Sequence, residues 1–197
     1  MLSPVAQLLK QQTARAHERV ETTLALLDPD LTQDRLQAVL ERFFGFWLAN
    51  ERGVEDWASA SPALARTAQW PRRRRTEVLR HDLLRLGLTV RGLAELPQAP
   101  PVFDTVADAD AMGWLYVSEG STLGGAVLDR TVRATFEVRT FTPYVEGPAP
   151  MWRDYLAMLA DWVGDDASRR DRVVASAVAT FDALGEWLAP LAGEVAA

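Results

Sequence analysis

Apolar residues recur three or four positions apart through most of this 197-residue chain, as Val5, Leu9 and Val20 do near its start. This spacing places apolar side chains on one face of an α-helix. Only residues 136–145 alternate as a strand would, and that stretch is short. The pattern predicts an all-α fold, a single-domain helical bundle spanning residues 1–197.

Local signals predict where the helices begin and end. Ser3 can cap free N–H groups and Pro4 fits the first helical position, so the first helix begins there. Gly87 and Gly164 are expected C-caps. The expected helices cover about residues 3–27, 32–60, 70–86, 104–135, 150–163 and 168–191, with one short turn in the Pro-rich loop near residues 88–102.

Composition narrows the classes of site. The chain has no cysteine, which excludes disulfides, iron–sulfur clusters, cysteine zinc sites and thiol nucleophiles. Its two histidines exclude a three-histidine site. A net charge of −6 argues against a general nucleic-acid binder. Because no leader peptide or long apolar run is visible, we expect a cytoplasmic protein with no membrane partner.

The first candidate site surrounds His17. Lys10, Thr13, His17 and Glu21 fall close to one line along a helix. A carboxylate four residues after a histidine can hold the second ring nitrogen, which makes the imidazole a better metal ligand. A structural histidine on a half-buried face is the alternative.

The second candidate site is rich in glycine. Gly120, Gly124 and Gly125 lie within a predicted helix, where each costs about 1 kcal/mol relative to alanine. Two interpretations stay open: close helix packing through Gly120 and Gly124, or a flat ligand lying against bare backbone. In the second, the hydroxyls of Ser121 and Thr122 face the ligand or water.

Two further patterns carry weaker information. The run Arg72–Arg75 is expected to be a solvated face, with a docking patch for an acidic partner as the alternative. His81 is expected to be a surface histidine. The 7 Trp and 7 Phe residues are mostly expected in the core, and they are also compatible with a large planar cofactor.

Taken together, the first two patterns resemble heme oxygenase. KQQTARAHERVE resembles the proximal helix of that family, and LYVSEGSTLGGAVL resembles its distal helix. The chain is most similar to the bacterial biliverdin-producing branch, often found beside bacteriophytochromes. The resemblance implies heme b as both cofactor and substrate. It also implies opening of the ring, by default at the alpha position, to biliverdin with O₂ and external electrons, releasing CO and Fe²⁺.

The resemblance also implies roles for particular residues. His17 is the expected iron ligand through Nε2, with Glu21 holding its other nitrogen. Lys10, Arg130 and Arg153 are the expected propionate contacts, and Thr13 lines the proximal side. Gly120, Ser121, Gly124 and Gly125 are expected over the heme plane, with Tyr116 and Phe181 as further heme contacts. Gly120, Ser121 and Gly124 are the expected catalytic positions.

One departure from the family concerns the proton supply. Many members carry an aspartate on the distal helix where this chain has Ser121. Glu119 is nearby in sequence but points about 200° away around the helix. We therefore expect Ser121 and ordered waters to deliver the proton, with help from another helix.

Other functions compete with this one. A heme carrier without turnover would share the His17 pocket. A di-iron oxidase needs Glu-x-x-His motifs and a thiamin-degrading enzyme needs a cysteine nucleophile, and both are absent. The expected partners are an electron donor such as ferredoxin or flavodoxin, docking near Arg72–Arg75, and a bacteriophytochrome that receives biliverdin.

Overall fold

The computed structural model describes residues 2–195. Within that range, the side chains of residues 126–127, 129–131, 133–134 and 193–195 are not described. The propionate contact predicted for Arg130 therefore lies outside the described residues. No strand occurs among the residues described, which confirms the all-α prediction.

Helices account for nearly all of the regular structure. They are α1 (Pro4–Leu24), α2 (Gln33–Ala60), α3 (Pro62–Thr67), α4 (Trp70–Arg73), α5 (Thr76–Arg85), α6 (Val90–Glu95), α7 (Asp108–Phe136), α8 (Pro148–Val163) and α9 (Ala167–Leu188), followed by a 3₁₀ segment, Ala189–Val195. The capping signals behave as expected, since Ser3 Oγ accepts from the Ala6 N–H and Pro4 opens α1.

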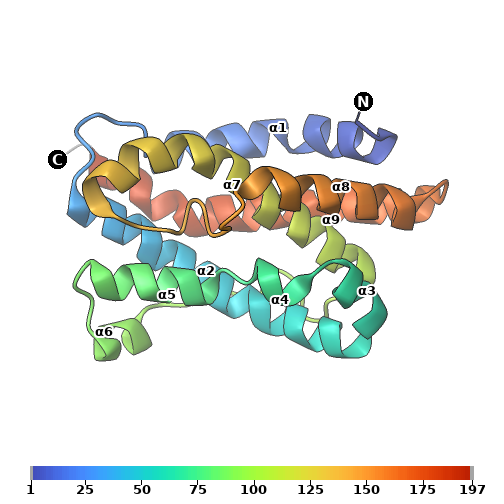
Figure 1. Cartoon of the computed structure of the whole chain (residues 1–197), viewed down its shortest axis with the longest axis horizontal. Coiled ribbons are helices and arrows are strands. Elements are labelled where there is room, and N and C mark those ends of the chain that lie inside the picture. The colour runs from blue at the N-terminus through green and yellow to red at the C-terminus, as the bar shows by residue number, and fades with distance from the viewer. Residues whose placement is uncertain (1, 196–197) are drawn as a thin grey trace.

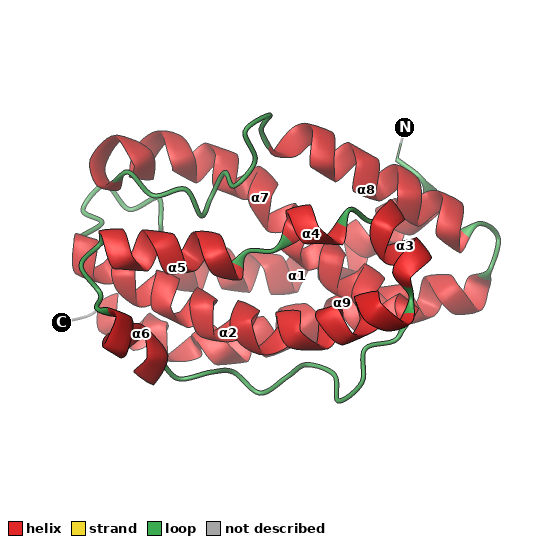
Figure 2. Cartoon of the chain, turned by 60° about the horizontal axis from the view of Figure 1, so that its bottom comes forward, coloured by secondary structure: helices red, strands yellow, loops and turns green. Residues whose placement is uncertain are grey.

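The helices stack in two groups that share a core (Figure 1). Helix α9 packs against α1 and α7, and α8 packs against α7. Helix α2 packs against α5 on the other side of the molecule. Figure 2 shows the ribbon of α7 bending along its length, which the glycines in its middle permit.

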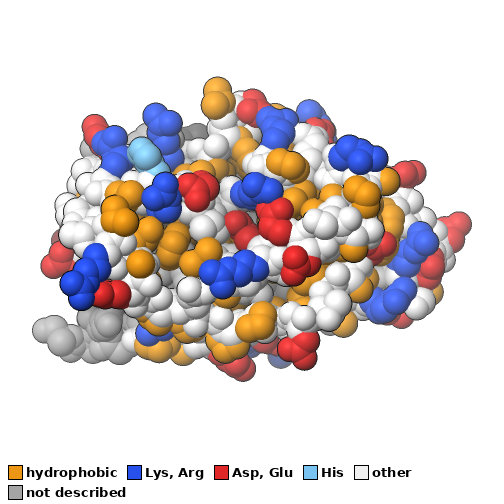
Figure 3. Space-filling model, turned by 90° about the horizontal axis from the view of Figure 1, so that it is seen from below, with side chains coloured by type: hydrophobic (Ala, Val, Ile, Leu, Met, Phe, Trp, Pro, Cys, Tyr) orange, Lys and Arg blue, Asp and Glu red, His pale blue; other side chains and the backbone are white. Residues whose placement is uncertain are grey.

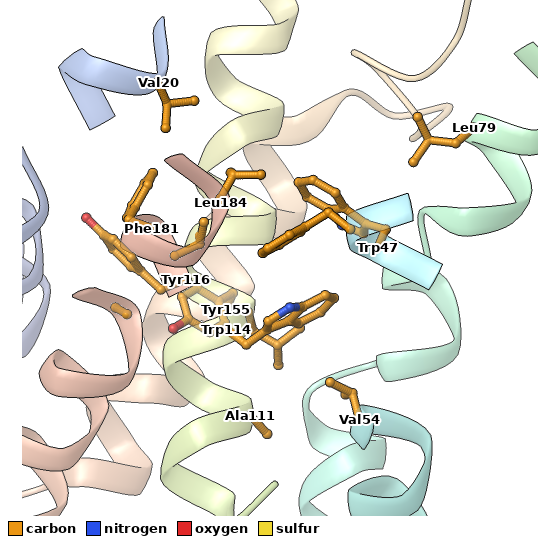
Figure 4. Packing of buried hydrophobic residues seen from close by; sticks show 14 of the residues in the cluster. Val20, Trp47, Val54, Leu79, Ala111, Trp114, Tyr116, Tyr155, Phe181 and Leu184 are labelled. Atoms are coloured by element: carbon orange, nitrogen blue, oxygen red, sulfur yellow. The ribbon is translucent and has the colours of Figure 1, made fainter. Parts of the chain in front are cut away.

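Buried apolar side chains from Val5 to Leu191 form one continuous cluster. Figure 4 shows side chains from several helices meeting there. Trp70 and Trp114 meet edge to face with ring centroids 5.6 Å apart. Most of the aromatic residues therefore belong to the core, as expected.

The single helix predicted over residues 70–86 is two helices in the structure, with a break between residues 73 and 76, so that prediction is wrong. Helix α4 ends at Arg73 and α5 begins at Thr76. Arg73 and Arg75 both turn inward, and Arg74 adopts an extended conformation between them. The Glu51 carboxylate accepts from the Arg75 N–H at 2.6 Å and so caps the start of α5.

Two other features of the helices differ from expectation. Helix α1 stops at Leu24 because Ala25 adopts a left-handed conformation, with φ of 48°. Helix α3 is an addition to the predicted helices: Ser61-Pro62 ends α2, and Pro62 also opens α3, because proline fits the first position of a helix. The alternating stretch, residues 136–145, forms no strand, in agreement with the all-α prediction; the Asp82 carboxylate, rather than a neighbouring strand, accepts from the Arg139 and Thr140 N–H groups.

The surface carries both signs of charge. Figure 3 shows one face on which arginines, acidic residues and small apolar patches are interspersed. Within the described residues, no helix combines the length and the apolar character needed to cross a membrane.

Candidate functional site

A cavity of about 390 Å³ opens among helices α1, α2, α5, α7 and α9. That volume lies within the range of small-molecule sites, about 300–1,000 Å³. Its lining is mostly apolar and includes Val20, Leu24, Leu26, Phe43, Trp47, Leu79, Val117, Leu128, Phe141, Phe181 and Leu184. Figure 4 labels Val20, Trp47, Leu79, Phe181 and Leu184 among them, which belong to α1, α2, α5 and α9.

His17 and its neighbours form what we call the α1 wall of the cavity: His17, Val20, Glu21 and Leu24 of α1 with Phe181 and Leu184 of α9. His17 Nδ1 lies 3.4 Å from Glu21 Oε2, which is longer than a full hydrogen bond. The side chain of His17 is 44% exposed, and its ring meets the edge of Phe181 with centroids 5.7 Å apart.

Glycines define the α7 wall: Val117, Ser121, Gly124, Gly125 and Leu128 of α7 with Thr140 and Phe141. A Cβ atom placed on Gly124 would meet nothing within 4 Å, so bare backbone faces open space there. A Cβ on Gly125 would overlap the carbonyl oxygen of Phe141. A Cβ on Gly120 would only touch Trp152 at 3.8 Å.

These contacts separate the two interpretations of the glycines. Gly125 serves close packing, but against the 137–147 segment rather than another helix. Gly124 serves the cavity. Helix packing through Gly120 and Gly124, one of the two alternatives, is therefore wrong.

Ser121 is exposed on the α7 wall, and its hydroxyl is already engaged. Ser121 Oγ donates to the Ser118 carbonyl at 2.7 Å. A hydroxyl has one proton and two lone pairs, so Ser121 faces the cavity as an acceptor. Thr122 is buried and donates in the same way to the Glu119 carbonyl, away from the cavity lining.

A buried group of charges lies behind the α7 wall. Arg73 Nη1 lies 2.6 Å from Glu119 Oε2, and both side chains are about 1% exposed or less. Tyr144 donates to the other oxygen of Glu119 at 2.6 Å. Burial raises the pKa of Tyr144, and the nearby charge of Glu119 raises it further. Glu119 points away from the cavity, as its position on the helix predicted.

The arginine run is thus not a solvated face, and that expectation is wrong for half of it. Arg73 and Arg75 are buried. Arg72 pairs with Glu146 and Arg74 pairs with Glu55, both near the surface. Each of the four arginines has partners within the protein. The run therefore does not form the continuous patch of unpaired positive charge on which docking of an acidic partner would depend.

Six of the predicted site residues line the cavity: His17, Glu21, Ser121, Gly124, Gly125 and Phe181. Lys10, Thr13, Tyr116, Gly120 and Arg153 are not among its lining residues. Thr13 is buried, and its hydroxyl donates to the Leu9 carbonyl at 2.8 Å. Burial raises the pKa of Tyr116. Lys10 and Arg153 are exposed, and His81 lies on the surface as expected.

Sequence reasoning missed several lining residues. Arg75 and Thr140 bring polar groups to the cavity, and the turn that follows α1, Ala25–Asp28, forms part of its rim. In the sequence, Arg75 belongs to the arginine run and the turn follows the predicted end of the first helix, but neither signal indicates a cavity. Among the described residues, no three His, Cys, Asp or Glu side chains gather to hold a metal ion.

Comparison with known proteins agrees with this geometry. The chain matches the sequence model of the heme oxygenase family over residues 3–189. It is 31% identical over 162 residues to a heme oxygenase of Xanthomonas campestris, covering 80% of this chain and 90% of that protein. It is 30% identical over 161 residues to heme oxygenase PigA of Pseudomonas aeruginosa, covering 78% and 76%.

A solved structure shares the fold. The NO- and CO-bound heme oxygenase of Neisseria meningitidis superposes with a TM-score of 0.72 at 21% identity, covering 98% of this chain and 94% of the other. At that identity the match shows the fold alone. The sequence matches, which span most of the chain, settle the family: the chain belongs to the heme oxygenases, the enzymes that degrade heme to biliverdin.

Proposed function

We propose that heme occupies the cavity as substrate, with His17 Nε2 bound to the iron. The observation that carries the proposal is that one cavity is lined by both the half-exposed His17 and the bare backbone of Gly124. Heme iron can be held by a single axial histidine of the protein, and the cavity wall offers one in His17.

The proximity of Glu21 supports the choice of nitrogen. Its carboxylate lies nearest Nδ1 of His17, which leaves Nε2 free to bind the iron. The rings of Phe181 and His17 form a T-shaped contact with centroids 5.7 Å apart, so Phe181 occupies one side of the imidazole. A neutral imidazole ligand suits oxygenation of the ring, because it pushes less electron density toward O–O cleavage than a thiolate does.

The α7 wall supports a flat ligand. Gly124 presents no side chain, so the porphyrin face and an O₂ molecule both find room there. Ser121 Oγ donates its proton to the Ser118 carbonyl, so toward the cavity it can only accept; in this rotamer it can orient a water molecule but does not itself supply the proton. Gly120 and Tyr116 lie outside the cavity lining; the Trp152 ring packs against Tyr116 and lies 3.8 Å from where a Cβ of Gly120 would stand.

Several finer expectations stay predictions. Lys10, Arg130 and Arg153 stay candidates for the propionates, with Lys10 and Arg153 able to move because they are exposed. Ring opening at the alpha position, use of O₂, delivery of electrons by a ferredoxin or flavodoxin, transfer of biliverdin to a bacteriophytochrome and a cytoplasmic location follow from the family resemblance.

Heme titration tests the proposal. Added hemin should produce a Soret band, and a reductant with air should replace that band by a biliverdin band in the red. His17→Ala should abolish axial ligation and turnover. His81→Ala is the matched control, because His81 is the only other histidine and lies on the surface.

Two results would contradict the proposal. An oxygenated complex that decays only to ferric heme would indicate a heme carrier, which the match to an enzyme family does not favour. Retention of the axial histidine in His17→Ala, with its loss in His81→Ala, would place the iron elsewhere.

A further inference from the structure

The accessible charge on the cavity lining is one-sided. Most lining residues are apolar, and the exposed charged side chains among those described are two acids, Glu21 and Asp28. Both lie where α1 ends, and we call Glu21 together with the turn Ala25–Asp28 the acidic rim of the cavity. Exposed carboxylates are negatively charged at neutral pH, so an anionic group of a ligand meets repulsion at this rim.

Hydrogen bonds within the turn hold Asp28 at the rim. The turn begins at Ala25 with φ of 48°, and the Asp28 N–H donates to the Ala25 carbonyl at 3.1 Å. Asp28 Oδ1 accepts from the Asp30 N–H at 2.9 Å, and the Asp28 carbonyl accepts from the Leu31 N–H at 3.1 Å. The Asp28 carboxylate is therefore presented at a defined place on the edge of the cavity.

The cations around this part of the cavity are engaged elsewhere. Arg75 is the one lysine or arginine among the described lining residues, but it is buried, and its terminal nitrogens donate to two backbone carbonyls. Arg35 lies outside the lining and donates to the Thr23 and Leu191 carbonyls. Asp28 makes no ion pair with a described residue, so its charge is left to act on the cavity.

The accessible cations that are candidates for the propionates lie away from the acidic rim. Lys10 precedes His17 by seven residues, about 10 Å along α1, whereas Asp28 lies beyond the other end of that helix. Arg153 belongs to α8, and Figure 1 shows α8 beside the first half of α1, away from the turn that follows it. Charge along the α1 side therefore runs from positive to negative.

Heme is a ligand that this asymmetry can orient. A porphyrin held through its iron can still turn in its own plane, because the bond to the histidine lies along the axis of rotation. Its two propionates share one edge of the ring, so their position decides which of the four meso carbons faces the α7 wall. Penalising the wrong arrangement is a common source of specificity, in addition to attraction for the right one.

We propose that Asp28 is a specificity-determining residue: with Glu21 it keeps the propionates away from the acidic rim, so that the propionate edge of the heme points toward the Lys10 side. This inference rests on the proposed heme site and deepens it. The repulsion fixes the ring in its plane and thereby selects the meso carbon that is oxidised.

Reversal of the charge at Asp28 tests this without turnover. In the cyanide-bound ferric complex, NMR signals of the heme methyl groups report how the ring is turned relative to His17. A hemin with methyl groups in place of both vinyl groups is used, so that turning the ring over gives no second set of signals. Asp28→Lys should bind this hemin, and the ratio of a second in-plane orientation to the first should rise about three- to tenfold, since attraction replaces repulsion across water.

Matched variants and a matched ligand isolate the charge. Asp30→Lys makes the same change two residues further on, at an exposed position outside the lining, and should keep the wild-type ratio. Asp28→Asn keeps an oxygen to accept from the Asp30 N–H, so it covers a lysine variant that does not fold, and should raise the ratio about two- to threefold. With the dimethyl ester of the hemin, which has no propionate charge, Asp28→Lys and the wild type should agree.

The product should follow the orientation. With ordinary hemin, Asp28→Lys should release a second biliverdin isomer in the proportion of the second orientation. An unchanged ratio in folded, heme-loaded Asp28→Lys and Asp28→Asn would overturn the proposal, and so would an equal change in Asp30→Lys or a change that persists with the diester. Failure of the wild type to bind hemin through His17 would instead overturn the proposed heme site.

Discussion

The two walls of the cavity each carry an ionisable pair, and the pairs differ in their access to water. On the α1 wall, His17 and Glu21 are 44% and 63% exposed, with their nearest atoms 3.4 Å apart. Behind the α7 wall, Arg73 and Glu119 are almost fully buried and only 2.6 Å apart. The α1 pair is open to water and to a ligand, whereas the α7 pair is fixed by the fold around it.

The difference indicates a division of labour. A pair in contact with water contributes little to stability but can meet a ligand without rearrangement of the protein. A buried pair adds little net stability itself, yet losing one partner leaves an uncompensated charge. We therefore expect substitutions in the α1 pair to change mainly the affinity for heme, and substitutions in the α7 pair to change mainly the free energy of unfolding.

The largest expected effect is the removal of one charge behind the α7 wall. Arg73→Met should lower the free energy of unfolding by about 3–5 kcal/mol, because Glu119 would stay buried without its cation. His17→Ala, the matched change on the α1 wall, should lower it by less than about 1 kcal/mol, because the side chain is half exposed. Urea denaturation of the heme-free proteins measures both.

A double variant separates the pair from its surroundings. Arg73→Met with Glu119→Leu should be less destabilised than the sum of the two single changes, since neither charge is then left alone. Equal stability losses in Arg73→Met and His17→Ala would show that the two walls do not differ as described.

The α1 wall was predictable from the sequence because its signals are local. His17 and Glu21 share one helix, and their spacing alone puts them on one face. Lys10 and Thr13 follow the same line but do not line the cavity. Seven residues of helix separate Lys10 from His17 by about 10 Å along the axis, so its contact with a propionate stays a prediction.

The α7 wall was only partly predictable. The glycines identified the helix, and Gly124 meets the cavity as the ligand interpretation required. The burial of Arg73 and Arg75 was not predictable, because four consecutive arginines are usually solvated. Their charges are compensated by groups distant in the sequence: Glu119 pairs with Arg73, and the Thr140 carbonyl accepts from Arg75. No local sequence pattern predicts those contacts.

Adjacent glycines on the α7 wall provide the next test. Gly125→Ala should destabilise the heme-free protein by about 1–3 kcal/mol, because the new methyl group would overlap the carbonyl of Phe141. Gly124→Ala should instead stabilise it by up to about 1 kcal/mol through helix propensity, because its methyl group meets open space. Thermal unfolding measures the two shifts, which should be opposite in sign.

The same two variants should diverge in activity. Gly124→Ala puts a methyl group into the cavity and should slow biliverdin formation in a protein that is no less stable. A Gly124→Ala variant with normal turnover and raised stability would show that the bare backbone is not needed for the reaction.

A smaller effect concerns the pH dependence of stability on the α7 side. Burial raises the pKa of Glu51 above its usual value of 4.5, although hydrogen bonds from Thr76 and the Arg75 N–H work against the shift. The folded state therefore prefers the protonated acid. The contribution of Glu51 to stability is therefore greatest below pH 4.5. It decreases as the pH rises through the pKa of Glu51 in the unfolded chain and then through its higher pKa in the folded protein.

Glu51→Gln removes this titration but also weakens the cap of α5. Its stability relative to the wild type should become more favourable between about pH 4 and pH 7, whatever the constant offset from the lost cap. Chemical denaturation at several pH values measures the difference. If Glu51→Gln instead became less stable relative to the wild type as the pH rises, the pKa of Glu51 would be lowered in the folded state.

The smallest expected effect is on the α1 wall, from Glu21→Gln. The amide oxygen can still accept from His17 Nδ1, so only the negative charge is lost. Groups behind a metal-bound histidine are commonly worth 10–100-fold in metal affinity. Here both side chains are largely in water and 3.4 Å apart, so we expect less than about a threefold loss of hemin affinity in a direct titration. A tenfold loss or more would mean that heme binding draws Glu21 into a short hydrogen bond, and the contrast between a free α1 pair and a fixed α7 pair would then hold only for the heme-free protein.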